Sequence, residues 1–266
     1  MKEYEPFITE EDRITLQAFR DFTNKEIVPR RKRLDNTDRK EAHKAFIEVA
    51  EGLMQMDYQR RALPESIGGL GRVSTVNQSA VAEELSRGDL TAAPILGLTG
   101  NVFGPAMTAR NNIVLEKFAA PFCLKDRPRL AALSMCEETG GCNLQDHSER
   151  AAAVQTTARL VNNEWVINGH KQWTSNGSVA EIYAVVCQTD PSLKENGITW
   201  IYVPAGTKGM TFSPPHDLMG LRADFNTEVF YDDVRVSKAW RASDEPGRDY
   251  HSLRRVTSYN RLISAS

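Results

Sequence analysis

Hydrophobic positions in the first half of the chain recur every three or four residues, the spacing of one face of an α-helix. Thr9, followed by three acidic residues, predicts the start of a first helix, and Pro29 predicts its end. A second helix is predicted behind a cap at Thr37, with its apolar face spread over residues 42–53. These two segments favour a helical fold for the first half.

Two more helices are predicted further along this half. One starts at a Ser74 cap and ends at Gly88, and the other covers residues 113–118 before Pro121. Residues 63–71 combine turn formers with apolar residues, which predicts a fixed loop and not a floppy linker. Together the four helices predict a helical bundle.

From about residue 131 the apolar pattern changes to a period of two, which is typical of β-strands. Residues 154–160 alternate, and Asn162 and Asn163 form a turn signal before the next apolar run, which together predict a hairpin. Residues 182–186, 198–203 and 227–236 are further strand candidates. Strands at this spacing predict a β-barrel or sandwich.

The fold class that follows is α+β with more than one domain. The predicted domains are a helical bundle over 1–130, a β-domain over 131–245 and the first turns of a further helical domain over 246–266. The last segment carries an apolar stripe, which we expect to pack against a domain that this chain does not contain. The stripe comprises Leu253, Val256, Asn260 and Ile263.

Charge and composition exclude several classes of function. The 33 Lys and Arg residues nearly balance the 35 Asp and Glu residues, so no overall basic field favours nucleic acid. No apolar stretch approaches the roughly 20 residues of a membrane helix, and the N-terminus lacks the apolar core of a signal peptide. The cysteines form no CxxC pair or metal-ligand spacing, so we expect free thiols, no metal and a cytoplasmic location. They are Cys123, Cys136, Cys142 and Cys187.

The order of these segments, together with four local strings, resembles the flavin-dependent acyl-CoA dehydrogenases. The strings are LPESIGGLG at 63–71, EELSRG at 83–88, NGHKQWTSNG at 168–177 and LMGLR at 218–222. The resemblance covers essentially the whole chain except the C-terminal helical domain of that family. It implies FAD as cofactor.

The resemblance also implies which residues bind the flavin through a loop at 136–143. Main-chain N–H groups of Met135, Cys136, Gly141 and Cys142 would hold the ring edge and the pyrophosphate, because such donors do not depend on side-chain type. Cysteines at 136 and 142 replace the hydroxyl residues of the family pattern. Since a thiol is the weaker donor and acceptor, flavin affinity or potential should differ from the family norm.

Three consecutive residues after Gln172 match the other side of the flavin site. Trp173 matches a tryptophan that covers one face of the ring, Thr174 follows it, and Ser175 matches a hydroxyl residue at flavin N5. An aromatic plane excludes water from the ring, and a hydroxyl that donates to N5 can stabilise the charge that arrives there with a hydride.

The catalytic base is the missing part of the resemblance. Tyr259 and Asn260 precede Arg261, the residue that matches a family arginine, so the alternative position of the base carries no carboxylate. Glu137 matches a structural glutamate, and Glu138 and Asp224 are interpreted as solvated surface charges. The implied substrate contacts are Cys142, Ser258, Asn260 and Arg261.

The resemblance therefore implies oxidation of an acyl-CoA to the 2,3-enoyl-CoA, with a carboxylate supplied by a missing or partner domain. The acyl group would arrive on coenzyme A or an acyl-carrier protein, an electron-transfer flavoprotein would accept the electrons, and the chain would form a homo- or hetero-oligomer. Two alternatives stay open: a flavin-dependent monooxygenase of the same fold, and a non-catalytic subunit that binds acyl groups or flavin. Acyl chain length is left undetermined.

Overall fold

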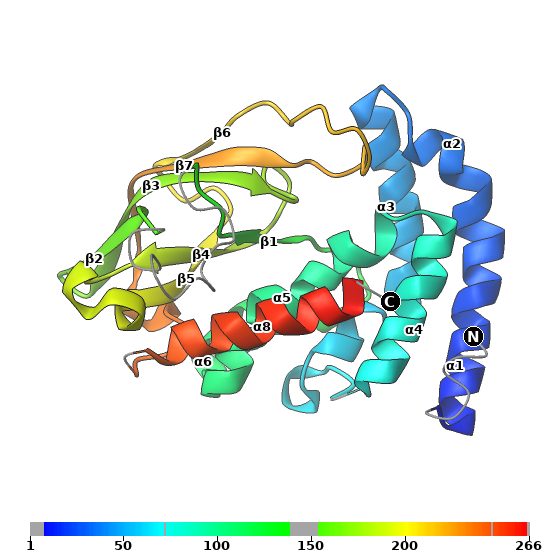
Figure 1. Cartoon of the computed structure of the whole chain (residues 1–266), viewed down its shortest axis with the longest axis horizontal. Helices are drawn as coiled ribbons and strands as arrows, with labels where there is room; N and C mark the ends of the chain where they lie inside the picture. The colour runs from blue at the N-terminus through cyan, green and yellow to red at the C-terminus, as the bar shows by residue number, and fades with distance from the viewer. Residues whose placement is uncertain (1–7, 72, 139–153, 246, 265–266) are drawn as a thin grey trace.

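The computed structural model describes residues 8–71, 73–138, 154–245 and 247–264. Its α-helices are α1 (Glu10–Phe22), α2 (Arg31–Leu34), α3 (Arg39–Gln55), α4 (Thr75–Gly88), α5 (Ala92–Ala109), α6 (Asn112–Val114) and α8 (Arg248–Ser264). Its strands are β1 (Ala131–Ser134), β2 (Thr157–Val161), β3 (Glu164–Thr174), β4 (Ile182–Gln188), β5 (Ile198–Pro204), β6 (Met210–Phe212) and β7 (Thr227–Ser237). Figure 1 shows α1, α3 and α4 side by side at one end and the sheet at the other, with α5 and α8 along the sheet. A helical region followed by a curled sheet confirms the predicted fold class.

The helix starts follow the capping rules, with one difference. The Thr9 Oγ1 atom accepts from the Asp12 main chain at 3.1 Å while Asp12 accepts from Thr9, a capping box that confirms the first start. Ser74 likewise caps α4, as predicted. The cap of α3 is Asp38 and not Thr37, because the Asp38 carboxylate accepts from the Lys40 main chain at 3.0 Å.

Helix α5 has no counterpart among the predicted helices. Pro94, Gly97, Gly100, Gly104 and Pro105 lie within it, and each lowers the helix signal of the sequence. Close packing explains two of these glycines: a Cβ at Gly100 would lie 3.0 Å from Ala62, and one at Gly104 would lie 2.7 Å from Val256. Tertiary packing therefore overrides weak local propensity in this helix.

The strands form one seven-stranded sheet with the order β1, β4, β2, β3, β7, β6, and β5 pairs with β4. The predicted hairpin is confirmed: β2 and β3 pair antiparallel across Asn162 and Asn163, both with positive φ. Strand β4 pairs parallel with β1 and antiparallel with β5. Strand β3 pairs antiparallel with β7 over most of its length, which brings the end of β3 beside the start of β7.

Helix α8 shares a core with the sheet and α5. Leu253 is 1% exposed in a hydrophobic cluster that also contains Phe103 of α5 and Trp200 of β5, and Val256 packs against the same cluster. The expectation that this stripe packs against an absent domain is therefore wrong for Leu253 and Val256, because α5 covers them. No helix among the described residues is long and apolar enough to cross a membrane.

Candidate functional site

The end of β3 lies beside the segment that follows β1. The main-chain N–H of Gln172 donates to the Cys136 carbonyl at 2.9 Å, and Lys171 Nζ donates to the Met135 carbonyl at 3.1 Å. This pairing brings two predicted flavin-binding residues, Met135 and Cys136, next to Trp173. The structure thus assembles residues that lie almost forty positions apart in the sequence.

The turn after β3 is held in an unusual conformation. Trp173 and Asn176 both have positive φ, at 54° and 59°. The Asn176 amide donates to the Ala131 carbonyl at 2.9 Å, and the Gly177 N–H donates to the Phe225 carbonyl at 2.8 Å. A Cβ at Gly177 would lie only 2.1 Å from the Thr227 hydroxyl, so this position requires glycine. The turn is therefore anchored to both β1 and the start of β7.

Trp173, near the end of β3, is the exposed aromatic beside this turn. It is 56% exposed, and its ring centroid lies 4.5 Å from that of His216. Thr174, in contrast, is fully buried, and its hydroxyl lies 3.4 Å from that of Ser134. Thr174 thus holds the strand end in place, while the part of the Trp173 ring that His216 leaves exposed is available to a flat ligand.

Asp224 is a buried neighbour of this turn, 1% exposed. Its Oδ2 atom accepts from the Ser175 hydroxyl at 2.7 Å, and its Oδ1 atom accepts from the Asn176 N–H at 3.0 Å. The Asn226 amide lies 3.4 Å from Oδ2 and 3.3 Å from the Ser175 hydroxyl. The interpretation of Asp224 as a solvated surface charge is therefore wrong, because the turn closes over it. Glu138, by contrast, is exposed as expected.

The charge of Asp224 is only partly compensated. Burial raises the pKa of Asp224, and the hydrogen bonds from Ser175, Asn176 and Asn226 oppose that rise. Within the described part of the chain, no ion pair reaches its carboxylate; Arg39 contributes its charge from a distance and contacts the Asp224 carbonyl at 3.4 Å. Only a weak sequence signal pointed to this residue: an acidic side chain two positions after the LMGLR string.

Glu137 occupies a second buried position at the same strand end. Its Oε1 atom lies 2.7 Å from Lys171 Nζ and accepts from the Thr156 N–H and hydroxyl, while Oε2 accepts from the Gln155 N–H. Although burial opposes ionisation, the charge of Lys171 and these hydrogen bonds hold the pKa of Glu137 below its usual value. Glu137 is thus fully bonded within the protein, which fits a structural role.

Three residues around this turn carry unsatisfied polar atoms: His216 beside Trp173, Asn226 beside Ser175, and Thr227 beside Gly177. The Nε2 atom of His216, the Oδ1 atom of Asn226 and the Oγ1 atom of Thr227 are buried and have no hydrogen-bond partner among the residues that the structure describes. Such atoms are costly unless a ligand or water completes them. Beside the exposed part of the Trp173 ring, they fit a flat ligand with polar edges, as a flavin is.

The other predicted binding residues divide into two groups. Gly141 and Cys142, together with the side chains of Asn260 and Arg261, lie outside the described residues. Ser258 is exposed on α8, a helix that packs against α4, α5 and β5. The described site therefore consists of Met135, Cys136, Trp173 and Ser175. The structure adds three residues to which the sequence pattern gave no role at the site: Asp224, Asn226 and His216.

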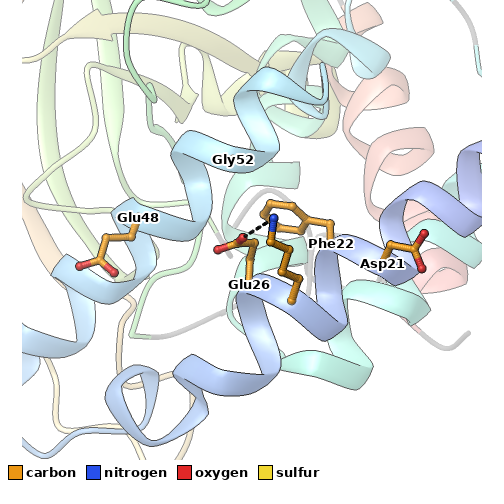
Figure 2. A pocket seen from close by; sticks show the side chains of 6 residues that line it. Asp21, Phe22, Glu26, Glu48 and Gly52 are labelled. Atoms are coloured by element: carbon orange, nitrogen blue, oxygen red, sulfur yellow. Dashed lines mark ion pairs between the residues drawn. The ribbon is translucent and has the colours of Figure 1, made fainter.

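A hollow of different character lies on the helical side of the molecule (Figure 2). Its lining carries three carboxylates and one lysine, and Lys25 lies 3.9 Å from Glu26 within it. The hollow is lined by Asp21, Phe22, Lys25, Glu26, Glu48 and Gly52. An excess of negative charge does not suit a pyrophosphate. In the described ranges, no group of His, Cys, Asp and Glu side chains could hold a metal ion.

Two family models cover most of the chain. The N-terminal domain of acyl-CoA dehydrogenases matches residues 9–111, and their middle domain matches residues 132–234. The chain belongs to the acyl-CoA dehydrogenase family. The end of β3, with Trp173 and Ser175, falls inside the matched middle domain.

Individual relatives agree with this assignment. The short-chain specific acyl-CoA dehydrogenase of Homo sapiens mitochondria is 28% identical over 260 residues, which make up 97% of this chain and 59% of the relative. The chain thus spans about three fifths of that relative's length.

Solved structures share the fold. An acyl-CoA dehydrogenase from Bacillus anthracis, complexed with FAD, superposes with a TM-score of 0.81 at 20% identity over 97% of this chain and 41% of its own. A nitroalkane oxidase mutant crystallized with 1-nitrooctane superposes with a TM-score of 0.86 at 20% identity over 97% of this chain and 64% of its own. At these identities the likeness establishes the fold alone.

Proposed function

We propose that this chain binds FAD at the end of β3 and forms the flavin-binding part of an acyl-thioester dehydrogenase. The observation that carries the proposal is the exposed Trp173 ring, set in a strained turn beside unsatisfied polar atoms of His216 and Asn226. The family membership and the FAD complex of a relative support the same cofactor.

Each residue at this site has a defined task in the proposal. Trp173 covers one face of the flavin and excludes water from it. Main-chain N–H groups of Met135, Cys136, Gly141 and Cys142 hold the ring edge and the pyrophosphate, while Thr174 fixes the strand end and Ser175 lies at flavin N5. FAD, when bound, supplies the acceptor for the hydride that leaves the acyl β-carbon.

The proposal assigns the α-proton to a carboxylate outside this sequence, in a further domain or a partner subunit. Glu137 does not suit this task, because Lys171 and Thr156 occupy its Oε1 atom. Asp224 does not suit it either, because its carboxylate is 1% exposed behind Ser175. We further propose that the substrate contacts Cys142, Ser258, Asn260 and Arg261. An electron-transfer flavoprotein would accept the electrons, and the chain would associate into oligomers.

FAD binding by the purified chain tests the cofactor. We expect a flavin absorption spectrum in the protein and a Trp173→Ala variant that binds FAD at least tenfold more weakly, because the ring loses its stacking partner. Phe230→Ala serves as the matched control: Phe230 is also a partly exposed aromatic, but it stacks on His170 on β3. Equal FAD affinity of wild type and Trp173→Ala would contradict the proposed site.

Substrate bleaching tests the reaction. Addition of an acyl-CoA to the FAD-loaded chain, together with a protein that supplies the missing carboxylate, should bleach the flavin without O₂. Consumption of O₂ with externally reduced flavin would instead favour the monooxygenase alternative. FAD binding without either reaction would favour a non-catalytic subunit.

A further inference from the structure

The geometry points to Asp224 as a positioning residue that fixes the direction of the Ser175 hydroxyl, so that Ser175 presents a hydrogen-bond acceptor, and not a donor, to the flavin. This inference rests on the proposed function. It reverses the donor role that the family resemblance implies for the Ser175 hydroxyl, and it names Asp224 as the residue responsible.

The hydroxyl group of Ser175 has two hydrogen-bond partners within the protein. A serine hydroxyl has one proton and two lone pairs. Its proton is directed at Asp224 Oδ2 over 2.7 Å, and the Asn226 amide donates to the Ser175 oxygen at 3.3 Å. One lone pair is left for a ligand. Because the acceptor is a carboxylate, the Ser175–Asp224 bond is stronger than a bond between neutral groups.

The neighbours of Asp224 hold its carboxylate beside Ser175. The Asn176 N–H binds Oδ1 at 3.0 Å, so the carboxylate cannot rotate away from Ser175 without losing that bond. Arg39 on α3 donates to the Asp224 carbonyl, and His43 on α3 lies 3.2 Å from the Ala223 carbonyl. Among the described residues, Arg39 and His43 are the charged or titratable side chains that interact electrostatically with the Asp224 carboxylate. The acceptor of the Ser175 proton is thus held in place from three sides.

The consequence concerns the two redox states of the cofactor. Flavin N5 carries a lone pair when oxidised and a proton when reduced. When its proton is directed at Asp224, the Ser175 oxygen repels the N5 lone pair of oxidised flavin. The same oxygen accepts a hydrogen bond from the N5–H group of reduced flavin. Asp224 therefore favours reduced over oxidised FAD through Ser175.

The midpoint potential of bound FAD tests this inference, measured by dye equilibration at pH 8. Ser175→Ala removes the acceptor and should lower the potential, with reduced FAD losing about tenfold in relative affinity, or about 30 mV for a two-electron couple. Ser175→Thr keeps the hydroxyl and should retain the wild-type value to within a few millivolts. A free hydroxyl that serves both redox states would leave the Ser175→Ala potential unchanged or raise it.

The role of Asp224 is isolated by a double-mutant cycle with Asp224→Asn. The Asn176 N–H orients the new amide so that its NH₂ group faces Ser175, which releases the serine proton toward the flavin. Removal of the negative charge shifts the potential as well, and Asp224→Asn in the Ser175→Ala background measures that contribution alone. We expect the change in potential caused by Asp224→Asn to be more negative in the wild-type background than in the Ser175→Ala background.

The outcomes separate the inference from the proposed function. A coupling of zero or of opposite sign, with FAD bound normally, overturns the inference and leaves the proposed function intact. A wild-type chain that binds no FAD overturns both. If Asp224→Asn fails to fold, the sign of the Ser175→Ala shift decides the inference without it.

Discussion

Two buried carboxylates at the end of the same strand have opposite environments. Glu137 contacts the cation of Lys171 and accepts from three further donors, and its pKa is lowered. Asp224 is as deeply buried but accepts only from neutral groups, Ser175 among them, and its pKa is raised. Burial alone therefore does not define the role of an acidic residue; its partners do.

The two carboxylates therefore have different roles: Glu137 stabilises the structure of the site, and Asp224 orients a residue of the site. The Glu137–Lys171 pair joins the segment after β1 to β3 and is fully engaged in bonds within the protein. Asp224 instead acts on Ser175, which faces the proposed flavin. A carboxylate without a cation is costly to bury, and such a cost is commonly found where function requires it.

The largest expected effect comes from breaking the Glu137–Lys171 pair. Lys171→Met leaves Glu137 charged and buried without its cation, which should lower the free energy of unfolding by about 3–5 kcal/mol in urea titrations. The double variant Glu137→Gln/Lys171→Met removes both charges and should recover more than half of that loss. A double variant as unstable as Lys171→Met would show that packing, and not charge, is decisive.

A third buried carboxylate sharpens the comparison. Asp249, at the start of α8, accepts from the Thr199 hydroxyl at 2.5 Å and the Trp200 N–H at 3.0 Å, and burial raises its pKa to about 6 although Arg241 Nε lies 3.7 Å from Oδ2. A rise from 3.8 to about 6 corresponds to about 3 kcal/mol. This contribution of Asp249 to the free energy of unfolding is fully present below about pH 4. It is lost as the pH rises to about 6, because the carboxyl ionises at a lower pH in the unfolded chain than in the folded protein.

Unfolding of Asp249→Asn across pH 4–7 checks that assignment. The amide keeps an acceptor for Thr199 and Trp200 and does not ionise, so the variant should gain stability relative to wild type over this window. A constant difference between the two proteins across the window would contradict the raised pKa.

Asp224→Asn and Glu137→Gln should show opposite pH trends. Burial raises the pKa of Asp224, so wild-type stability falls as its carboxyl ionises, and Asp224→Asn should gain stability relative to wild type with rising pH. The pKa of Glu137 is lowered, so its contribution is lost as the pH falls, and the deficit of Glu137→Gln should shrink in acid. Parallel trends in thermal unfolding would refute the contrast between the two residues.

The smallest expected effect is that of Glu138→Gln. Glu138 is exposed and adjacent to Glu137, so its substitution should change the free energy of unfolding by less than about 0.5 kcal/mol. It is the matched control for Glu137→Gln in the same segment. A larger change would mean that Glu138 has a partner that matters for stability.

Local patterns were sufficient for most elements of the fold. The caps at Thr9 and Ser74 and the turn at Asn162 and Asn163 were predictable, because hydrogen bonds within a few residues define them. Helix α5 was not predictable in this way, because its glycines and prolines favour a helix only when neighbouring elements pack closely against them. Long-range packing therefore supplied what local propensity lacked.

In the candidate site, too, some residues could be predicted from local strings and others could not. The resemblance indicated Met135, Cys136, Trp173 and Ser175 from strings of consecutive residues, and their role in flavin binding stays a prediction. The string carrying Trp173 and Ser175 ends at residue 177, while Asp224 and Asn226 follow a different string. Nothing in either string shows that a carboxylate at 224 accepts a proton from a hydroxyl at 175.

The sequence by itself determined that a helical half precedes a strand half, the family, and the residues around the exposed tryptophan, because these depend on local spacing and on matching strings. The tertiary structure alone decided which carboxylates are buried, which cation or hydroxyl each one contacts, and that α8 packs against α5. The physical reason is that burial and charge pairing arise from contacts between segments far apart in the chain. Such contacts leave no local signal in the order of the residues.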